Sequence, residues 1–263
     1  YSRSFIEHFI IPMGEAVWSA DPLKFNEFPA LYFAQFFKNH GFLYIQDQPQ
    51  WLTVKGRSRT YIKPITKSYA DKIRLNSPVA SVRRHEDWVE ITPENQPSEK
   101  FDQVVIAAHS DQALGMLDDP SDAEQKILGA IPYQENEAVL HCDESLLPSK
   151  KAAWASWNYH IPKEDTGRVA VTYDMNILQS IGAPEEFCVS LNLAKAIDPD
   201  KIHRKYEYHH PAYNPESLTA RQSHAQISGI NRTHFAGAYW GYGFHEDGVR
   251  SAVEVCKHFN KVL

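Results

Sequence analysis

The segment THFAGAYWGYGFHEDGVRSA, residues 233–252, constrains the fold of this chain more than any other. An apolar strand pattern reaches Gly237, a glycine-containing turn follows, and the run HEDG leads into a helix. Glycines let a backbone approach a ligand closely and adopt positive φ. Free N–H groups at a helix start, together with the helix dipole, favour an electron-rich or anionic ligand. The segment therefore predicts a ligand-binding loop, the alternative being an ordinary strand-to-helix turn capped by Asp247.

The first part of the chain is predicted to be helical. Apolar residues recur at helical spacing from Phe5 to Trp18 and again from Leu31 to Phe37, until Gly41 ends the pattern. We therefore expect helices across residues 2–46. The region is unusually aromatic, which leaves two interpretations, namely core packing or the wall of an apolar substrate pocket.

The middle of the chain is dominated by strand patterns. Several alternate apolar and polar residues, as half-buried antiparallel strands do, and the continuous apolar run at 104–108 predicts a strand buried on both faces. We expect an α/β fold with α+β character, in which a mixed, largely antiparallel sheet with helices accompanies pieces of a second α/β layer. The expected strands cover 51–54, 79–83, 88–91, 104–108, 138–142, 152–159, 168–175, 187–191, 202–209 and 233–238, with a polar turn at 93–100 and helices at 111–117, 121–130, 217–227 and 246–262.

Composition excludes some functions. The chain has 263 residues, 43% of them hydrophobic, and a formal net charge of -6, which argues against a nucleic-acid binder. No apolar run approaches the roughly 20 residues of a membrane span, although peripheral membrane association stays open. The start, YSRSFIEH, has no signal-peptide pattern, and the first residue is Tyr1, so we expect upstream sequence to be missing.

The cysteines and histidines predict no metal site. Cys142, Cys188 and Cys256 are an odd number and far apart, which favours buried free thiols in a reducing, cytoplasmic compartment. His209 and His210 would point to opposite faces of a strand, and in the run HCDE at 141–144 only alternate residues share a face.

The last segment resembles the C-terminal flavin-binding motif of the flavin-containing amine oxidoreductase superfamily, most of all a bacterial branch of predicted NAD/FAD-binding proteins. The stretches at 9–22, 36–43, 49–62, 75–84 and 152–162 are similar to the same branch, so the resemblance covers nearly the whole chain. It implies FAD as cofactor. The GxGxxG fingerprint that begins such proteins is absent, which predicts a fragment lacking the N-terminal Rossmann segment. The implied domains are 1–70, the helical part of a substrate domain; 71–110, strands of the FAD domain; 111–225, the antiparallel sheet of the substrate domain; and 226–263, the C-terminal FAD-binding strand and helix.

The resemblance also implies roles for individual residues. Val79 would meet the adenine through its backbone, with a plain strand valine as the alternative. His245 falls where amine oxidases place an aromatic cage residue, and His141 takes the place of a lysine that acts through water on the flavin. A histidine there would relay protons or orient that water, the alternative being a satisfied strand histidine. The remaining implied cofactor residues are Ala107 and Ala108 near the phosphates, Gly237 and Ala238 under the ribityl-pyrophosphate, and Glu246, Asp247 and Gly248 beneath the pyrimidine edge.

Three functional hypotheses follow. In the first, the parent protein is an FAD-dependent oxidoreductase that transfers a hydride from a hydrophobic small molecule to flavin. In the second, this chain by itself is a cofactor-free substrate- or partner-binding domain without catalysis. In the third, the chain is a lipid- or protein-binding module, although no residue pattern specifically indicates this. The oligomeric state stays open.

Overall fold

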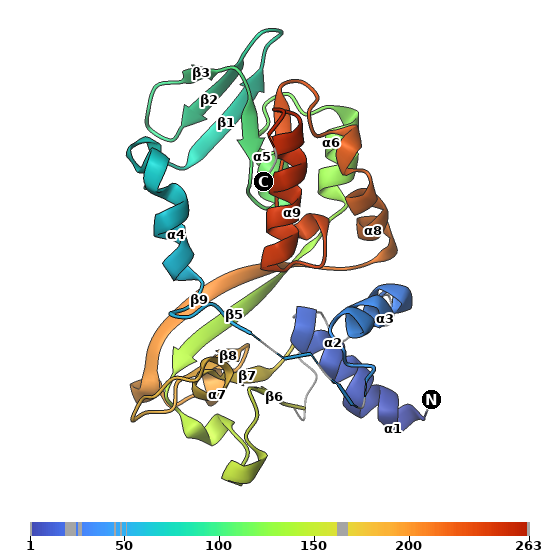
Figure 1. Cartoon of the computed structure of the whole chain (residues 1–263), viewed down its shortest axis with the longest axis vertical. Helices are drawn as coiled ribbons and strands as arrows, with labels where there is room; N and C mark the ends of the chain where they lie inside the picture. Colours follow the sequence, from blue (N-terminus) through green and yellow to red (C-terminus); the bar gives the residue numbers. More distant parts are fainter. Residues whose placement is uncertain are drawn as a thin grey trace. The chain divides into compact units, whose positions relative to one another are not determined.

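The computed structural model describes residues 2–18, 25, 28–44, 46–47, 49–50, 52–161 and 168–261. The chain forms two compact units, each assembled from two segments far apart in sequence (Figure 1). Unit 1 comprises Tyr1–Phe36 and Pro132–Pro215, and unit 2 comprises Phe37–Ile131 and Glu216–Leu263. None of the described helices is long and apolar enough to cross a membrane.

Unit 1 is built on a five-stranded antiparallel sheet, which confirms the predicted central sheet. Strand β5, the neighbour of the edge strand β9, is covered on both faces, because Ala138 packs with Ala16, Val171 and Leu191 while its neighbour Val139 packs with a separate apolar cluster. The strand order is β6 (Trp157–Tyr159), β7 (Val171–Asp174), β8 (Cys188–Leu191), β5 (Tyr133–His141) and β9 (Ile202–Pro211).

Aromatic side chains form much of the helical core of unit 1. Trp18 is only 5% exposed, and its ring centroid lies 4.7 Å from that of Phe28, 4.7 Å from that of Phe36 and 6.1 Å from that of Tyr213. Of the two interpretations of this aromatic region, these contacts are those of core packing. The helices at the start of the chain are α1 (Arg3–Phe5), η1 (Ile6–Ile10), α2 (Ile11–Trp18) and α3 (Ala30–Asn39), and later segments of unit 1 contribute η4 (Glu144–Leu146), η5 (Lys151–Ala153), α7 (Met175–Gln179), η6 (Ala194–Ala196) and η7 (Pro199–Lys201).

Unit 2 holds two small sheets. The first is antiparallel and contains β1 (Val79–Arg84), β2 (Val89–Pro93) and β3 (Glu99–Phe101), the first two forming the expected hairpin. The second is a parallel pair, β4 (Val104–Ile106) and β10 (Thr233–Phe235), which confirms the α/β character of the fold. Its helices are α4 (Arg59–Thr66), η3 (Lys67–Lys72), α5 (Ser110–Met116), α6 (Asp122–Gly129), η8 (His224–Gln226), η9 (Ala238–Trp240) and α9 (His245–Lys257), with α8 (Pro215–Gln222) beginning where unit 1 ends.

Several local predictions were wrong. The run at 104–108 is not buried on both faces, because Val105 is 45% exposed in a sheet that has only one neighbouring strand among the described residues. Residues 52–54 form no strand, and residue 51 lies outside the described residues. The polar turn at 93–100 contains the start of β3. The strand at 168–175 ends at Asp174, whose carboxylate instead caps α7, and the last helix ends at Lys257.

A buried ion pair fixes α6 against β1 within unit 2. Arg84 Nη1 and Nη2 donate to the two carboxylate oxygens of Glu124 at 2.8 and 3.0 Å, and both side chains are 3% exposed. Burial by itself raises the pKa of Glu124, but hydrogen bonds from Arg84 and Ser121 outweigh it and hold the pKa below its ordinary value. Arg84 also binds Asp119, so its guanidinium is fully engaged.

We expect Glu124→Ala to lower the free energy of unfolding by about 3–5 kcal/mol, because it leaves a buried guanidinium without its partner. Urea denaturation measures this loss. The matched control is Glu99→Ala, which removes an exposed partner of Arg74 and leaves the midpoint unchanged. Equal midpoints for wild type and Glu124→Ala would show that the pair contributes nothing.

Candidate functional site

The candidate cofactor site lies at the carboxyl edge of the parallel pair β4 and β10. Thr233 pairs with Val104 and Phe235 with Ile106, and Ala236 N donates to Ile106 O at 3.0 Å. Because parallel strands end at the same edge of a sheet, the segments that follow them emerge side by side. Crevices at the carboxyl ends of parallel strands are where open α/β sheets bind ligands. Of the predicted cofactor residues, Ala107, Ala108, Gly237 and Ala238 follow directly at this edge.

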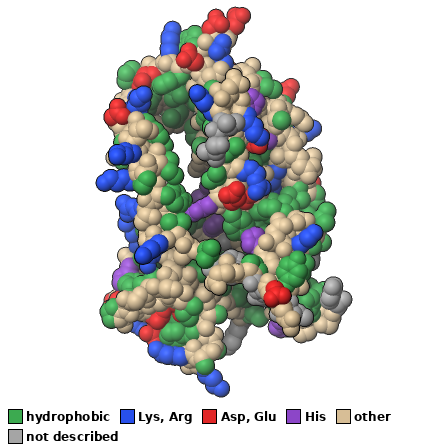
Figure 2. Space-filling model, in the orientation of Figure 1, with side chains coloured by type: hydrophobic (Ala, Val, Ile, Leu, Met, Phe, Trp, Pro, Cys, Tyr) green, Lys and Arg blue, Asp and Glu red, His purple; other side chains and the backbone are tan. Residues whose placement is uncertain are grey.

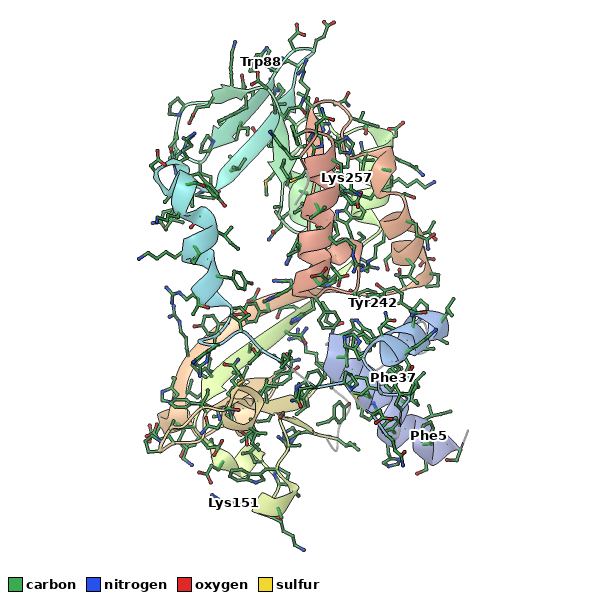
Figure 3. All side chains as sticks on the ribbon, in the orientation of Figure 1. Phe5, Phe37, Trp88, Lys151, Tyr242 and Lys257 are labelled. Atoms are coloured by element: carbon green, nitrogen blue, oxygen red, sulfur yellow. The ribbon has the colours of Figure 1, made fainter. Side chains whose placement is uncertain are left out.

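A buried carboxylate holds the glycine-containing turn before α9. Asp247 is 7% exposed, and its Oδ2 accepts hydrogen bonds from the backbone N–H groups of Tyr242 and Phe244, both at 3.1 Å. A Cβ on Gly241 would lie 2.3 Å from Asp247 Oδ1, so glycine is required there by close approach. Gly243 adopts φ 91°, a conformation that side-chain-bearing residues rarely take. Tyr242 lies at this end of α9, and Lys257 at the other (Figure 3).

The start of α9 is tied to the strand edge by a serine. Ser251 Oγ accepts from Gly237 N at 2.9 Å and donates to Gly248 O at 2.8 Å. A Cβ added to Gly248 would lie 3.9 Å from Ala238, so these small residues lie close together. The structure thus brings Gly237, Ala238, Asp247 and Gly248 into one constellation, with exposed Glu246 beside it.

His245 belongs to an exposed aromatic group at the first turn of α9. Its Nδ1 lies 3.4 Å from Tyr61 Oη of α4, although 184 residues separate the two. Phe244, 37% exposed, has its ring centroid 6.0 Å from that of His40. Sequence reasoning missed His40, Tyr61 and Phe244, because nothing in the chain's periodicity indicates which distant aromatic residues meet. The available sequence signal was Phe244, an aromatic residue inside the predicted ligand loop.

Val79 stands apart from this constellation. It begins β1, pairs with Pro93 of β2 and is half-buried, in the other sheet of unit 2. Its predicted backbone contact with adenine therefore stays a prediction.

His141 lies in unit 1 and is fully buried. Its Nδ1 accepts from Asp143 N at 3.1 Å, so Nε2 carries the proton and donates to Ser190 Oγ at 2.8 Å. Burial lowers the pKa of His141, and the charges of His203 and Lys201 add to this while Asp143 opposes it. These contacts are those of a satisfied strand histidine, the structural alternative for this residue.

A polar row continues from His141 across the sheet interior. Ser190 Oγ lies 2.8 Å from Thr172 Oγ1, which lies 2.9 Å from His160 Nε2. The row crosses β5, β8 and β7 and ends just after β6. Every member therefore has hydrogen-bond partners inside the sheet, which offsets the cost of burying polar groups there.

The WASWNY stretch contributes a second aromatic group to unit 1. Trp157 is 40% exposed, with its ring edge-on to that of Tyr173 at 5.5 Å, and Tyr159 Oη donates to the carboxylate of buried Glu15. Burial raises the pKa of Tyr173 to about 12, so its hydroxyl stays protonated. Trp154 is anchored by its indole N–H to Pro148 O at 2.8 Å.

Comparison with known proteins decides the family. Residues 2–174 match the model of the flavin containing amine oxidoreductases, which is more than half of the chain. The chain belongs to this family. FAD is accordingly the cofactor to consider, although the segment at 233–252 lies outside the matched residues. A search of curated protein sequences found no match to this chain.

Solved structures show the same fold for this chain. Cyclohexylamine oxidase from Brevibacterium oxydans IH-35A is similar at TM-score 0.65 and 16% identity over 99% of this chain. A CLA-producing fatty acid isomerase from P. acnes is similar at TM-score 0.57 and 14% identity over 77% of this chain, and putrescine oxidase bound to putrescine at 0.52 and 10% over 78%. The chain spans 66% of the first protein's length and 52% of each of the other two.

The buried His141 generates a pH prediction for this chain. The pKa of His141 is lower in the folded chain than its ordinary 6.5, so folding favours the neutral ring. That stabilisation is complete above about pH 6.5 and is lost as the pH falls toward the folded pKa. We expect His141→Gln to be less stable at neutral pH but to lose stability less steeply below about pH 6.5, by up to about 1.4 kcal/mol per pH unit.

Urea denaturation at several pH values measures this difference. Val139→Ala, a buried substitution on the same strand, serves as control because it lowers stability and keeps the wild-type slope. Identical slopes for wild type and His141→Gln would contradict the prediction.

Proposed function

We propose that this chain carries parts of the cofactor and substrate sites of an FAD-dependent oxidoreductase, which accepts a hydride from a C–N or C–C bond. The family assignment supports the flavin, which supplies the redox chemistry when bound. The observation that carries the proposal is the carboxyl edge of β4 and β10 meeting the first turn of α9. All eight predicted cofactor residues fall within unit 2, the proposed FAD-binding unit, and unit 1 is the proposed substrate unit.

The residues at this edge fit a dinucleotide. Ala107, Ala108, Gly237, Ala238 and Gly248 present small side chains, so backbone groups are accessible to a ligand. The first turn of an α-helix has N–H groups without intrahelical acceptors and the positive end of its dipole. In α9 these are the N–H groups of His245 and Glu246, and they would stabilise the negative charge that a reduced flavin carries at its pyrimidine edge.

The aromatic groups support an apolar substrate. Trp157, exposed beside Tyr173 in unit 1, and the group of Tyr61 and Phe244 in unit 2 offer flat apolar surface. His245 replaces a phenol-type cage residue by an imidazole, which is a weaker partner for a small cationic amine. An acyl chain, or a single-charged amine on an apolar ring, is therefore preferred over a polyamine with several charges; a fatty acid and cyclohexylamine are named in two of the similar structures.

The proposed cellular location and the proposed lack of nucleic-acid binding are based on the surface charges and the thiols. On the face shown in Figure 2, the described Lys and Arg side chains are scattered among acidic and hydrophobic ones and form no continuous basic patch. Cys142, Cys188 and Cys256 are free thiols, but only Cys188 is buried, so the prediction that all three are buried was wrong. We take a cytoplasmic protein that does not bind nucleic acid as the working assignment.

The cofactor proposal is tested by titrating the purified chain with FAD and following the quenching of flavin fluorescence. We expect binding, and a loss of affinity of more than about tenfold in Gly237→Val and in Asp247→Ala, equivalent to about 1.4 kcal/mol each. A side chain at Gly237 meets the Tyr239 ring, whose Cε1 lies 2.4 Å from the added Cβ, and loss of Asp247 releases the turn.

The matched control for this titration is Glu254→Gln, an exposed change farther along α9 that leaves FAD affinity unchanged. A wild-type chain that does not quench FAD fluorescence contradicts the proposal and favours a cofactor-free binding domain.

The substrate proposal has its own test, anaerobic bleaching of the flavin-loaded protein by candidate donors. We expect cyclohexylamine to reduce the flavin faster than putrescine, because apolar surface favours a single-charged amine with an apolar ring over a dication. Reduction by polyamines alone would reverse the assignment and leave the FAD proposal intact.

A further inference from the structure

We propose that unit 1 carries a zinc site formed by Cys142, Glu185 and His203. The thiol sulfur, a carboxylate oxygen and an imidazole nitrogen of these residues all lie within 4.8 Å of one another. They come from three segments, namely the residue after β5, the loop before β8, and β9. Short sequence runs such as HCDE contain no such set of ligands, because the fold brings the partners of Cys142 from remote segments.

Each ligand position is fixed by contacts independent of any metal. Cys142 N donates to Lys201 O at 3.1 Å, which continues the pairing of β5 with β9, the strand that carries His203. Asn176 secures the loop at the carboxylate ligand and just after it, because its Nδ2 donates to Glu185 O at 2.8 Å and its Oδ1 accepts from Phe187 N at 3.3 Å.

The imidazole is also restrained from one side. The ring centroid of His203 lies 5.6 Å from that of Phe187, so the loop that positions Glu185 also packs against the histidine. A preorganised metal site requires ligands that are held in place before the metal binds, and these contacts restrain the backbones of Cys142 and Glu185 and the ring of His203.

The donor set selects the metal. A thiolate, an imidazole and a carboxylate are ligands of Zn²⁺, whereas Mg²⁺ and Ca²⁺ prefer oxygen alone. With Zn–S near 2.3 Å and Zn–N near 2.0 Å, tetrahedral ligands stand roughly 3.5 Å apart, so small side-chain rotations close the site. Three protein ligands leave a fourth position for water. Because Glu185 and His203 are exposed and Cys142 is half-buried, an ion reaches the site from solvent.

The local charges balance. A thiolate and a carboxylate together neutralise a divalent cation. The nearby ammonium of Lys201 donates to the buried carboxylate of Asp143 at 3.1 Å, so its positive charge is already compensated. Without metal, the Cys142 thiol donates to Lys201 O at 3.7 Å, and zinc binding releases that proton. The bound ion would join the end of β5, β9 and the loop before β8, and stabilise unit 1 through binding to the folded state.

The test is zinc titration of the whole chain after chelation, with Co²⁺ as a spectroscopic probe. We expect a single tight Zn²⁺ site, a thiolate-to-cobalt absorption band, and a higher melting temperature with Zn²⁺. Cys142→Ser removes the band, and Cys142→Ser, Glu185→Gln and His203→Gln each weaken Zn²⁺ binding more than about tenfold.

Two control variants separate this site from other donors. His209→Gln disrupts a second, fully exposed group with Glu135 and Glu207, and Cys256→Ser removes the exposed thiol; both keep wild-type Zn²⁺ affinity. Unchanged Zn²⁺ affinity in the ligand variants, a cobalt complex without a thiolate band, or loss of binding in His209→Gln alone would overturn the proposal. Should Cys142→Ser not fold, the exposed Glu185→Gln and His203→Gln decide the matter. No step of this test depends on FAD.

Discussion

The parallel pairing of β4 with β10 is the constraint on which the candidate cofactor site depends. It joins residues 104–106 to residues 233–235, across more than a hundred residues of chain, and sets the carboxyl ends of both strands at one edge. Everything proposed for the cofactor follows from that register, because Ala107 and Gly237 emerge together and the turn after Gly237 leads straight into α9. The carboxylate of Asp247 then fixes the turn by accepting two backbone N–H groups, and Ser251 ties the helix to the strand end. A shift of one strand by one residue in this pairing would turn its side chains to the opposite face and separate these groups.

In unit 1 the main constraint is the burial of polar side chains. Its antiparallel sheet buries His141, Ser190 and Thr172 in the interior, where an unpaired polar atom is costly. The three residues lie on successive strands and hydrogen-bond to one another, so the row of polar side chains stays buried without unpaired polar atoms among these contacts. The aromatic core around Trp18 and the apolar clusters on both faces of β5 hold the sheet in place. Near the end of the same strand β5, the proposed zinc site uses the loop before β8 and the neighbouring strand β9, so one strand organises both the buried polar row and the metal ligands.

Particular elements show how far the sequence reaches. The strands of the β1–β2 hairpin were predicted at 79–83 and 88–91, and α6 was predicted as a helix at 121–130; the structure shows a Ser121–Glu124 capping box at its start. The prediction that the strand at 104–108 is buried on both faces was wrong. An apolar run shows that the side chains are hydrophobic but not which faces of the strand are covered, and Val105 is exposed to solvent. At 168–175 the strand pattern concealed a helix start, since Asp174 serves equally as a strand residue and as a cap. Of the candidate site, the small residues and Asp247 could be named from the motif, whereas Tyr61 and His40 could not.

The sequence by itself determined the local chemistry of this protein: the strand–glycine–helix segment, the family it resembles, the strands of the antiparallel sheet and the small residues at the cofactor edge. Local pattern suffices there because periodicity, glycine and capping act over a few residues. Only the tertiary structure decided which distant groups meet. It split the chain into two interleaved units, surrounded His141 with partners, placed Tyr61 beside His245 and assembled Cys142 with Glu185 and His203. These encounters depend on strand register and loop closure between remote segments, which no window of neighbouring residues contains.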